Sequence, residues 1–295
     1  MTDFHGKHVL ITGAARGLGA LVAERIASAG AKLTLWDVDG AALEATAGRI
    51  RSSGALAEWA AVDVSDPDAV GRAAADVTAR QGPVDVLVNN AGVVAGKPLT
   101  SLEPADVLRT FGVNTLAHFW TLRAFLPDML RRDSGHVVTI ASAAAICAAP
   151  RLADYSASKA AVFALDEALR LELEKLESRV RTLVVCPYYI DTGMFAGVRT
   201  RFWAVLPILD PGYVADRIVR AIRRDDQSLI LPWFVRVTWL VRLLPVSWFD
   251  AIVTFLGIAR SMDEFVGHGP PRPTPPSERR KPEPPRPAAG PQLQH

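Results

Sequence analysis

Short apolar runs alternate with longer segments of helical period along most of this 295-residue chain. Seven runs of four to seven residues are rich in Val, Ile and Leu. A strand that is apolar on both sides needs cover on both faces, which helices supply when the strands are parallel. The alternation therefore predicts an α/β fold with a doubly wound parallel sheet. The predicted strands are His8–Thr12, Lys32–Trp36, Leu56–Val62, Val84–Val88, His136–Ile140, Arg181–Val185 and Ser228–Leu231.

Six longer segments between these runs repeat their apolar residues every three or four positions, as amphipathic helices do. They are Leu18–Ala29, Ala41–Ser52, Pro67–Arg80, Ala105–Arg131, Tyr155–Glu177 and Gly212–Arg223. In a doubly wound sheet, ligands bind at the carboxyl ends of the strands. Side chains that directly follow a strand are therefore the first candidates for a site.

The chain divides into three parts by composition. Residues 1–231 hold all the predicted strands and form one Rossmann-type domain, and residues 232–266 form an apolar helical extension. Ten of the chain's 21 prolines lie in residues 267–295. Such a segment buries too little apolar area to offset the entropy lost on ordering, which predicts a disordered tail. The amino terminus reaches the first strand without an apolar signal region.

The charge balance and the cysteines narrow the classes of function. A formal net charge of +2 gives no strongly basic surface, so we expect no nucleic-acid partner. Cys147 and Cys186, the two cysteines, have no metal-type spacing and lie in apolar stretches. This predicts buried side chains and no metal site. A reducing cytoplasm is the expected location.

A glycine-rich turn follows the first predicted strand and opens the first predicted helix. Gly13, Gly17 and Gly19 permit a tight turn and a close approach of backbone to phosphate, while the helix N-terminus favours the anion. Their spacing is GxxxGxG, not the GxGxxG of the commonest dinucleotide fingerprint. Together with Leu18, this turn predicts a pyrophosphate site.

Two charged residues bear on which dinucleotide binds. Asp37 ends the second strand, where a carboxylate accepts hydrogen bonds from the ribose hydroxyls and repels a 2′-phosphate. Arg16 in the glycine turn opposes this, since an arginine pairs with a 2′-phosphate; its alternative is a solvent-facing side chain. A fixed carboxylate near a phosphate dianion costs more than a mobile arginine recovers, so NAD is predicted over NADP.

The third and fourth strands also end in candidate residues. Asp63 and Val64 follow the third strand, where a short acid and a backbone amide are suited to bracket an adenine edge. Asn90, Ala91 and Gly92 close the fourth strand. Small residues there let the chain pass close to a cofactor, and asparagine amides tie loop backbone together.

Tyr155 and Lys159 lie four residues apart on a predicted helix and therefore share a face. A tyrosine with a pKa of about 10 is a poor base at neutral pH. Lowering that pKa by about three units needs roughly 4 kcal/mol, which one positive charge at about 4 Å supplies at an effective dielectric near 20.

Ser142, after the fifth strand, offers a hydroxyl to the substrate oxygen. Asn114 is either a satisfied buried amide or the holder of a proton-relay water.

These motifs together resemble the short-chain dehydrogenase/reductase family. The TGxxxGxG turn, the NNAG turn and the tetrad Asn114, Ser142, Tyr155 and Lys159 occur in family order and spacing over about residues 5–230. The resemblance implies that Tyr155 is the base or acid, and that Lys159 lowers its pKa and binds the nicotinamide ribose. It implies that Ser142 orients the substrate and that Asn114 holds the relay water.

The turn after the sixth strand departs from the family pattern. Most members have Pro-Gly there, whereas two tyrosines follow Pro187 here. Ile190 and Thr192 still match the positions that hold the carboxamide. The predicted cofactor-binding residues are Gly13, Arg16, Gly17, Leu18, Gly19, Asp37, Asp63, Val64, Asn90, Ala91, Gly92, Tyr155, Lys159, Pro187, Ile190 and Thr192.

A narrower resemblance is to the retinol dehydrogenase and 17-beta-hydroxysteroid dehydrogenase group, which handles lipid alcohols. It rests on the segments Leu35–Asp37, Asn89–Val94, Ala117–Trp120, Ala124–Pro127 and Cys186–Phe195. Within them, His118 and Trp120 are predicted to pack between helices, with substrate contact as the alternative.

Two apolar regions follow the tetrad. Residues 194–211 are predicted as a substrate lid, whose apolar side chains include Phe195, Phe202, Trp203, Val205 and Leu206. An apolar lid suits a hydrophobic alcohol, and packing at a dimer interface is the alternative.

Residues 233–258 hold two apolar segments of 12 residues each, too short for the roughly 20 that span a bilayer. They predict peripheral membrane contact, with subunit packing as the alternative.

The sequence therefore predicts an oxidoreductase that transfers a hydride between a hydrophobic alcohol and NAD. The alternatives are an NADP-dependent carbonyl or acyl reductase, motivated by Arg16, and a non-catalytic dinucleotide-responsive binding protein. We expect a homodimer or homotetramer in the cytoplasm, with membrane association through residues 233–258 as a further hypothesis.

Overall fold

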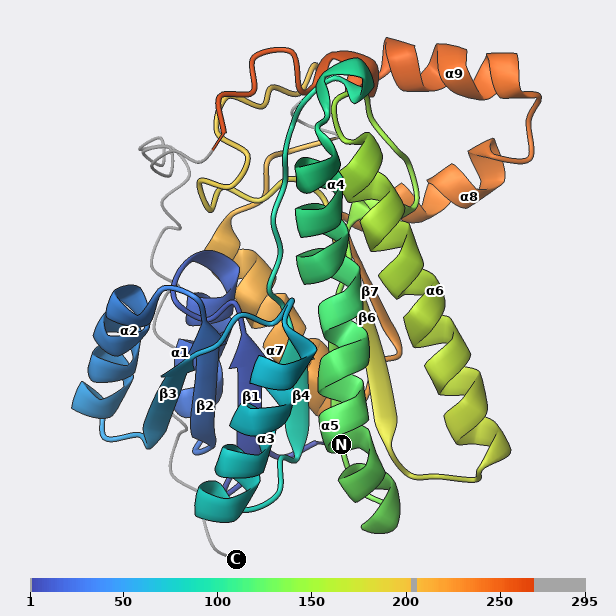
Figure 1. Cartoon of the computed structure of the whole chain (residues 1–295). Helices are drawn as coiled ribbons and strands as arrows, with labels where there is room; N and C mark the ends of the chain where they lie inside the picture. Colours follow the sequence, from blue (N-terminus) through green and yellow to red (C-terminus); the bar gives the residue numbers. More distant parts are fainter. Residues whose placement is uncertain (1, 203–205, 268–295) are drawn as a thin grey trace, which may run out of the picture.

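The computed structural model describes residues 2–202 and 206–267. Within them, seven strands form one parallel sheet in the order β3-β2-β1-β4-β5-β6-β7 (Figure 1). The strands are β1 His8–Thr12, β2 Lys32–Asp37, β3 Ala57–Ala61, β4 Val86–Asn89, β5 His136–Ile140, β6 Arg181–Pro187 and β7 Ser228–Leu231. All seven predicted strands are confirmed, with shifted ends: β3 is one residue shorter at each end, β4 begins two residues later and ends one later, and β2 and β6 run one and two residues further.

The sheet reverses its winding direction beside its first strand. β1 pairs with β2 on one side and with β4 on the other, so that Ile11 lies between Leu35 and Val88. This is the topological switch point at which doubly wound sheets bind their ligands. The five residues of β1 are buried, as a continuously apolar strand predicts.

Helices cover both faces of the sheet (Figure 1). One core packs under α1 Gly17–Ala27, α2 Gly40–Ser52 and α7 Pro211–Arg224. The second packs under α3 Pro67–Gln81, α5 Ala117–Arg131 and α6 Ala153–Lys175. The predicted doubly wound α/β fold is therefore confirmed.

The predicted helix Ala105–Arg131 is interrupted, which corrects the sequence-based expectation. It consists of α4 Pro104–Phe111, a π-helical turn over Gly112–Leu116, and α5. Two side chains of the turn bind across to neighbouring segments: Asn114 to the backbone of Val93, and Thr115 Oγ1 to the carbonyl of Ser158 at 3.0 Å. The chain keeps its helical direction through the π-helical turn, so the spacing of apolar residues in the sequence does not show where the α-helix is interrupted.

The apolar extension folds back along the carboxyl-end side of the sheet. A 3-10 turn over Trp233–Val237 leads into α8 Thr238–Val241 and α9 Val246–Phe255, which project as a hairpin (Figure 1). Among the described residues, no helix is both long and apolar enough to cross a membrane. Gly267, predicted as the first residue of the tail, pairs with Ala196; the rest of the tail lies outside the described residues.

Candidate active site

The glycine turn after β1 lies directly against the loop after β4. Gly13 has φ +66°, and a Cβ there would lie 2.7 Å from the Cα of Ala91. A Cβ at Gly19 would lie 2.2 Å from the carbonyl oxygen of Gly13. Only glycine fits these two approaches, and they leave the N-terminus of α1 open to an anion.

Asn90 joins the two loops through its amide. Its Nδ2 donates to the carbonyls of Thr12 and Gly13 at 2.9 and 3.0 Å. The Thr12 hydroxyl accepts from the backbone amides of Asn90 and Ala91 at 3.0 and 3.1 Å. The expected role of the asparagine turn in tying loop backbone is thus present in the structure.

Backbone amides hold the Asp37 carboxylate at the end of β2. Its Oδ2 accepts from the amide of Ala15 at 3.0 Å, and its Oδ1 accepts from the amide of Asp39 at 3.2 Å. Arg16 forms an ion pair with Asp39, and its side chain is 72% exposed, as the solvent-facing alternative expected. Two carboxylates and one guanidinium therefore surround the position predicted for the adenosine ribose.

Asp63 and Val64 lie apart from this arrangement. The Asp63 carboxylate accepts from the amide and hydroxyl of Ser65, at 2.9 and 2.7 Å, and Val64 is buried. Neither lines the main cleft. Their predicted contact with an adenine edge stays a prediction.

Tyr155 and Lys159 lie on one face of α6, deep in the cleft. The Lys159 Nζ donates to the carbonyl of Ile140 at 2.8 Å and lies 5.9 Å from the centre of the Tyr155 ring. Burial raises the pKa of Tyr155 to about 12, while a hydrogen bond with Ser142 opposes that rise. Burial lowers the pKa of Lys159 to about 8. The side chains of the protein alone therefore do not produce the depressed tyrosine pKa that the spacing of the pair predicted.

Ser142 and Asn114 approach the pair from two other elements. Ser142 follows β5, and its hydroxyl accepts from the amide of Ala144 at 3.1 Å. Asn114 is fully buried and donates both amide protons, to the Val93 carbonyl at 2.9 Å and the Ser158 hydroxyl at 3.0 Å. These bonds fix the loop after β4. Because both amide protons of Asn114 are already donated, a relay water at this position would have to donate its own protons to oxygen atoms. The water itself stays a prediction.

One cleft of about 560 Å³ connects these groups, apart from Asn114, which does not line it. The predicted site residues that line it are Gly13, Arg16, Gly17, Leu18, Gly19, Asp37, Asn90, Ala91, Gly92, Ser142, Tyr155, Lys159, Pro187, Ile190 and Thr192. Residues from the ends of five strands thus meet in one space, as the switch-point rule expects. A volume of this size is typical of sites for small molecules and cofactors.

The far end of the cleft is apolar, and much of it was missed from the sequence. The predicted lid contributes Met194, Phe195 and Leu206; Trp203 and Val205 lie outside the described residues. The extension contributes further lining side chains that were expected at a membrane or subunit contact: Phe234, Val235, Val237, Thr238, Val241, Leu256 and Ile258. Only the folded chain brings these residues to the tetrad, because more than 70 positions separate them from Tyr155.

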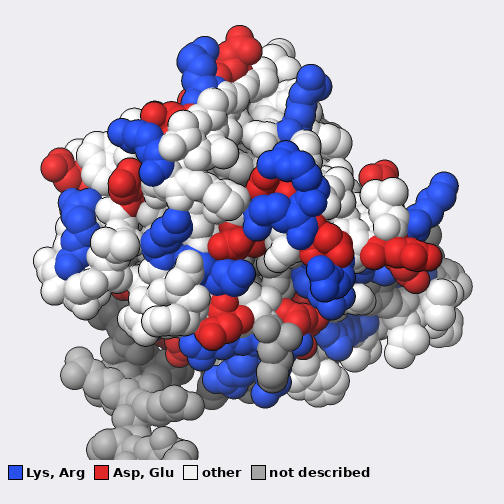
Figure 2. Space-filling model, turned by 90° about the horizontal axis from the view of Figure 1, so that it is seen from below, with Lys and Arg blue, Asp and Glu red and all other residues white. Residues whose placement is uncertain are grey.

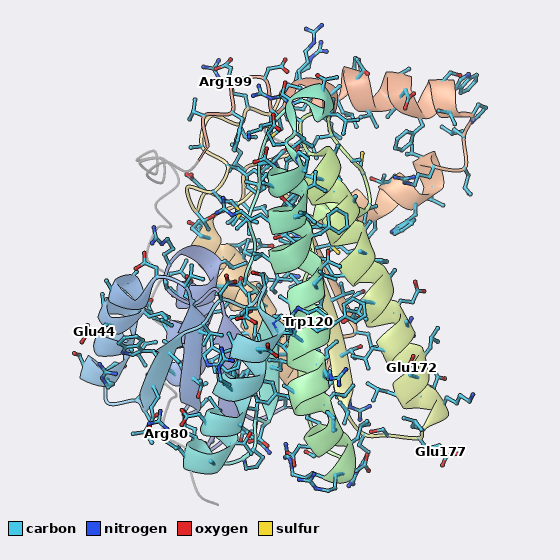
Figure 3. The ribbon with its side chains drawn as sticks, viewed as in Figure 1. Glu44, Arg80, Trp120, Glu172, Glu177 and Arg199 are labelled. Carbon is cyan, nitrogen blue, oxygen red and sulfur yellow. The ribbon has the colours of Figure 1, made fainter. Side chains whose placement is uncertain are left out.

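Cys147 and His118 differ in their relation to the cleft. Cys147 is half-buried and lines it, which corrects its expected full burial; burial raises the pKa of its thiol. His118 is buried between helices and does not line the cleft. Trp120 lies in the first turn of α5, where it faces α3 (Figure 3). Helix packing, the favoured interpretation of both residues, fits their positions.

Comparison with known proteins agrees with the fold and the motifs. The profile of the short chain dehydrogenase family matches residues 7–202. Epidermal retinol dehydrogenase 2 of Homo sapiens is 39% identical over 264 residues, which cover 88% of this chain and 85% of that protein. The 17-beta-hydroxysteroid dehydrogenase 13 of Rattus norvegicus is 34% identical, over 89% of this chain and 87% of the relative.

Two solved structures share the fold. A short chain dehydrogenase/reductase from Burkholderia phymatum in complex with NAD has a TM-score of 0.75 and 31% identity, covering 82% of this chain and 95% of that chain. A metagenomic short-chain oxidoreductase in complex with NADP has a TM-score of 0.65 and 33% identity, covering 78% and 96%. The fold, the ordered motifs and the sequence match lead to one conclusion: the chain belongs to the short-chain dehydrogenase/reductase family.

Proposed function

We propose that this member of an oxidoreductase family oxidises hydrophobic alcohols with NAD. The observation that carries the proposal is the composition of the single cleft, which is polar at the strand ends and apolar beyond Tyr155. Its polar end suits a dinucleotide, and its apolar end suits a lipid, retinoid or steroid-like alcohol. The likeness to a retinol dehydrogenase and a hydroxysteroid dehydrogenase supports this substrate class.

The proposed mechanism assigns proton transfer to the protein. NAD, which the glycine turn, Asp37 and Lys159 would hold, would supply the hydride acceptor and a positive charge. The Tyr155 phenolate takes the proton of the substrate hydroxyl as the carbonyl forms. Ser142, already hydrogen-bonded to Tyr155, orients the substrate oxygen. Lys159 adds a buried donor beside the tyrosine, and in carbonyl reduction Tyr155 returns the proton as an acid.

The preference for NAD rests on charge at the adenosine end. Asp37 is held by two backbone amides, so it cannot turn away from a 2′-phosphate without losing both bonds. The guanidinium of Arg16 already forms an ion pair with Asp39, so its charge is partly neutralised before a 2′-phosphate binds. The second candidate function, an NADP-dependent carbonyl or acyl reductase, is favoured by the exposure of Arg16 at the rim of the cleft.

A series of straight-chain primary alcohols of increasing length tests the proposal. We expect NADH formation whose kcat/KM rises with chain length, because each added methylene buried in the apolar end contributes about 0.8 kcal/mol. Carbonyl reduction that proceeds only with NADPH would favour the second candidate. Dinucleotide binding without turnover of any alcohol or carbonyl would favour the binding-protein alternative.

We also propose that the α8–α9 hairpin docks on a lipid bilayer. Leu243 and Val246 at its tip are 82% and 76% exposed, and Trp248 is exposed beside them. Residues 233–258 carry three charged side chains, Arg236, Arg242 and Asp250, so basic residues outnumber the single acidic one, which suits anionic headgroups. Figure 2 shows the opposite end of the molecule, where acidic and basic side chains intermix. Inner side chains of the same hairpin line the cleft, so lipid substrates have a short route to it.

Flotation with phosphatidylcholine–phosphatidylserine vesicles tests this docking. The full chain should float with the vesicles, and Leu243→Ser should reduce the bound fraction. Leu56→Ser removes a similarly exposed leucine elsewhere and should leave the bound fraction unchanged. Concentration-dependent self-association that Leu243→Ser abolishes, without vesicle binding, would assign the hairpin to subunit packing. The homodimer or homotetramer stays a prediction, which sedimentation tests.

A further inference from the structure

The segment after α9 returns to the region predicted as the substrate lid. Residues 261–267, the C-terminal strap, lie along residues 194–202, the substrate loop. The backbone amide of Arg199 donates to the carbonyl of Ser261 at 3.1 Å, and the amide of Val266 donates to the carbonyl of Ala196 at 3.0 Å. The strap therefore adds an antiparallel backbone pairing to the outer side of the loop.

The inner side of the substrate loop touches the proposed base. The ring of Phe195 meets that of Tyr155 edge-on at 5.7 Å, and meets that of Tyr189 at 5.1 Å. The Tyr189 hydroxyl is 3.0 Å from the Oγ of Ser261, which is buried within the strap. A continuous set of packed contacts thus runs from the strap through Phe195 to Tyr155.

Arg151 fastens the strap to two other parts of the site. It lies four residues before Tyr155, with φ +63°, just before α6 begins. Its Nε donates to the carbonyl of Gly96 in the loop after β4 at 3.2 Å, and its Nη1 donates to the carbonyls of Met262 and Asp263, both at 3.1 Å. A guanidinium is suited to such a junction because its donors are fixed in one plane.

Two glycines in different loops leave room for the same segment. A Cβ at Gly96 would lie 2.0 Å from Cε1 of Phe265, and a Cβ at Gly197 would lie 2.0 Å from the carbonyl oxygen of Glu264. The loop after β4 and the substrate loop therefore accept the strap only where they lack side chains.

We propose that the C-terminal strap is a positioning element of the active site, and that Arg151 is the positioning residue that anchors it. By holding the substrate loop against Tyr155, the strap sets the orientation of the alcohol relative to the base. The catalytic part of this inference rests on the proposed function. The packing part does not, because loop protection is measurable without substrate.

Matched glycine substitutions test the strap. Gly96→Ala and Gly6→Ala place alanine at the same φ of +69°, but a Cβ at Gly6 meets nothing within 4 Å. Gly197 and Gly54 form a second pair at φ +87°, and a Cβ at Gly54 is likewise free. Each pair shares the backbone strain and differs in collision with the strap.

The readouts are amide hydrogen exchange of residues 194–202 in the substrate-free protein, and steady-state kinetics. Gly96→Ala and Gly197→Ala should speed exchange and raise KM for the alcohol roughly tenfold or more, with kcat also lowered. NAD affinity should change far less, and both control variants should match the wild type. In the Gly96→Ala background, Phe265→Ala should restore part of the lost KM by opening space for the new methyl group.

Arg151→Gln should speed exchange of the loop in the same way, and Arg151→Lys should give an intermediate rate because it keeps one donor. The proposal is overturned if each glycine variant matches its control in loop exchange and KM. A wild-type protein that oxidises no hydrophobic alcohol would remove the proposed function alone, since loop exchange would still decide the strap.

Discussion

At the residue scale, burial shifts the pKa values of Tyr155 and Lys159 in opposite directions. The tyrosine rises to about 12 and the lysine falls to about 8, so the site stabilises the uncharged form of each. A cation placed beside this pair would lower the pKa of Tyr155 strongly, because buried surroundings screen its charge poorly. Spacing on a helix predicted the pairing, but desolvation depends on Phe195 and the loops above, which the motif does not contain.

The predicted preference for NAD over NADP depends on the charge of Asp37. Asp37→Asn keeps the shape of the side chain and removes its charge. The ratio of the Kd for NADP to the Kd for NAD should fall about fivefold or more, because two unit charges about 4 Å apart repel by 1 to 4 kcal/mol. Isothermal titration with both dinucleotides measures that ratio.

Asp63→Asn is the control for this titration. Asp63 is predicted to meet the adenine, which both dinucleotides share, so this variant should change both affinities equally. An unchanged ratio in Asp37→Asn would show that Asp37 does not select against the 2′-phosphate.

At the element scale, the site depends on two interruptions of regular structure. The glycine turn brings α1 against the loop after β4, and the π-helical turn over Gly112–Leu116 places Asn114 opposite Val93. The glycine turn was predictable because its residues are local and chemically distinct. The π-helical turn was not, because its stabilising partners, Val93 and Ser158, are distant in the sequence.

Gly19→Ala and Gly48→Ala test the close approach at α1. Both glycines lie within helices, but a Cβ at Gly19 would lie 2.2 Å from the Gly13 carbonyl oxygen, whereas a Cβ at Gly48 meets nothing within 4 Å. Gly48→Ala should raise the free energy of unfolding by about 0.5–1 kcal/mol. Gly19→Ala should lower it and weaken NAD binding, as urea unfolding and titration will show. Similar gains in stability for both variants would refute the predicted clash.

At the scale of the whole molecule, the sheet and its helical layers followed from the sequence, because apolar period is encoded locally. The apolar wall of the cleft did not. Phe234, Val241 and Leu256 were interpreted as a surface for membrane or subunit, and their inner positions emerge only when the extension folds back over the sheet. Arg151 and the strap were missed for the same reason: their contacts span up to 112 positions.

Buried His118 predicts how stability depends on pH. Burial lowers its pKa to about 3 from 6.5, so below pH 6.5 the unfolded chain binds more protons than the folded one. Stability should therefore fall as the pH drops, with His118 alone contributing a loss of about 2 kcal/mol by pH 5. Urea unfolding at pH 7 and pH 5 should show His118→Phe losing about 2 kcal/mol less than the wild type between these values.

Replacement of His5 by Gln is the control, because that side chain is exposed and near solvent in both states. It should leave the pH dependence as in the wild type. Equal losses in His118→Phe and the wild type would contradict burial of a neutral imidazole at this position.

The central claim is that Tyr155 transfers the substrate proton during NAD-dependent oxidation of a hydrophobic alcohol. Its most direct test is the rate of NADH formation by Tyr155→Phe, beside Tyr213→Phe as a control on an exposed helix side chain. With a long-chain alcohol, Tyr155→Phe should lower kcat roughly 100- to 10,000-fold at nearly unchanged NAD affinity, while Tyr213→Phe keeps the wild-type rate. A Tyr155→Phe protein that oxidises the alcohol at the wild-type rate would contradict the account.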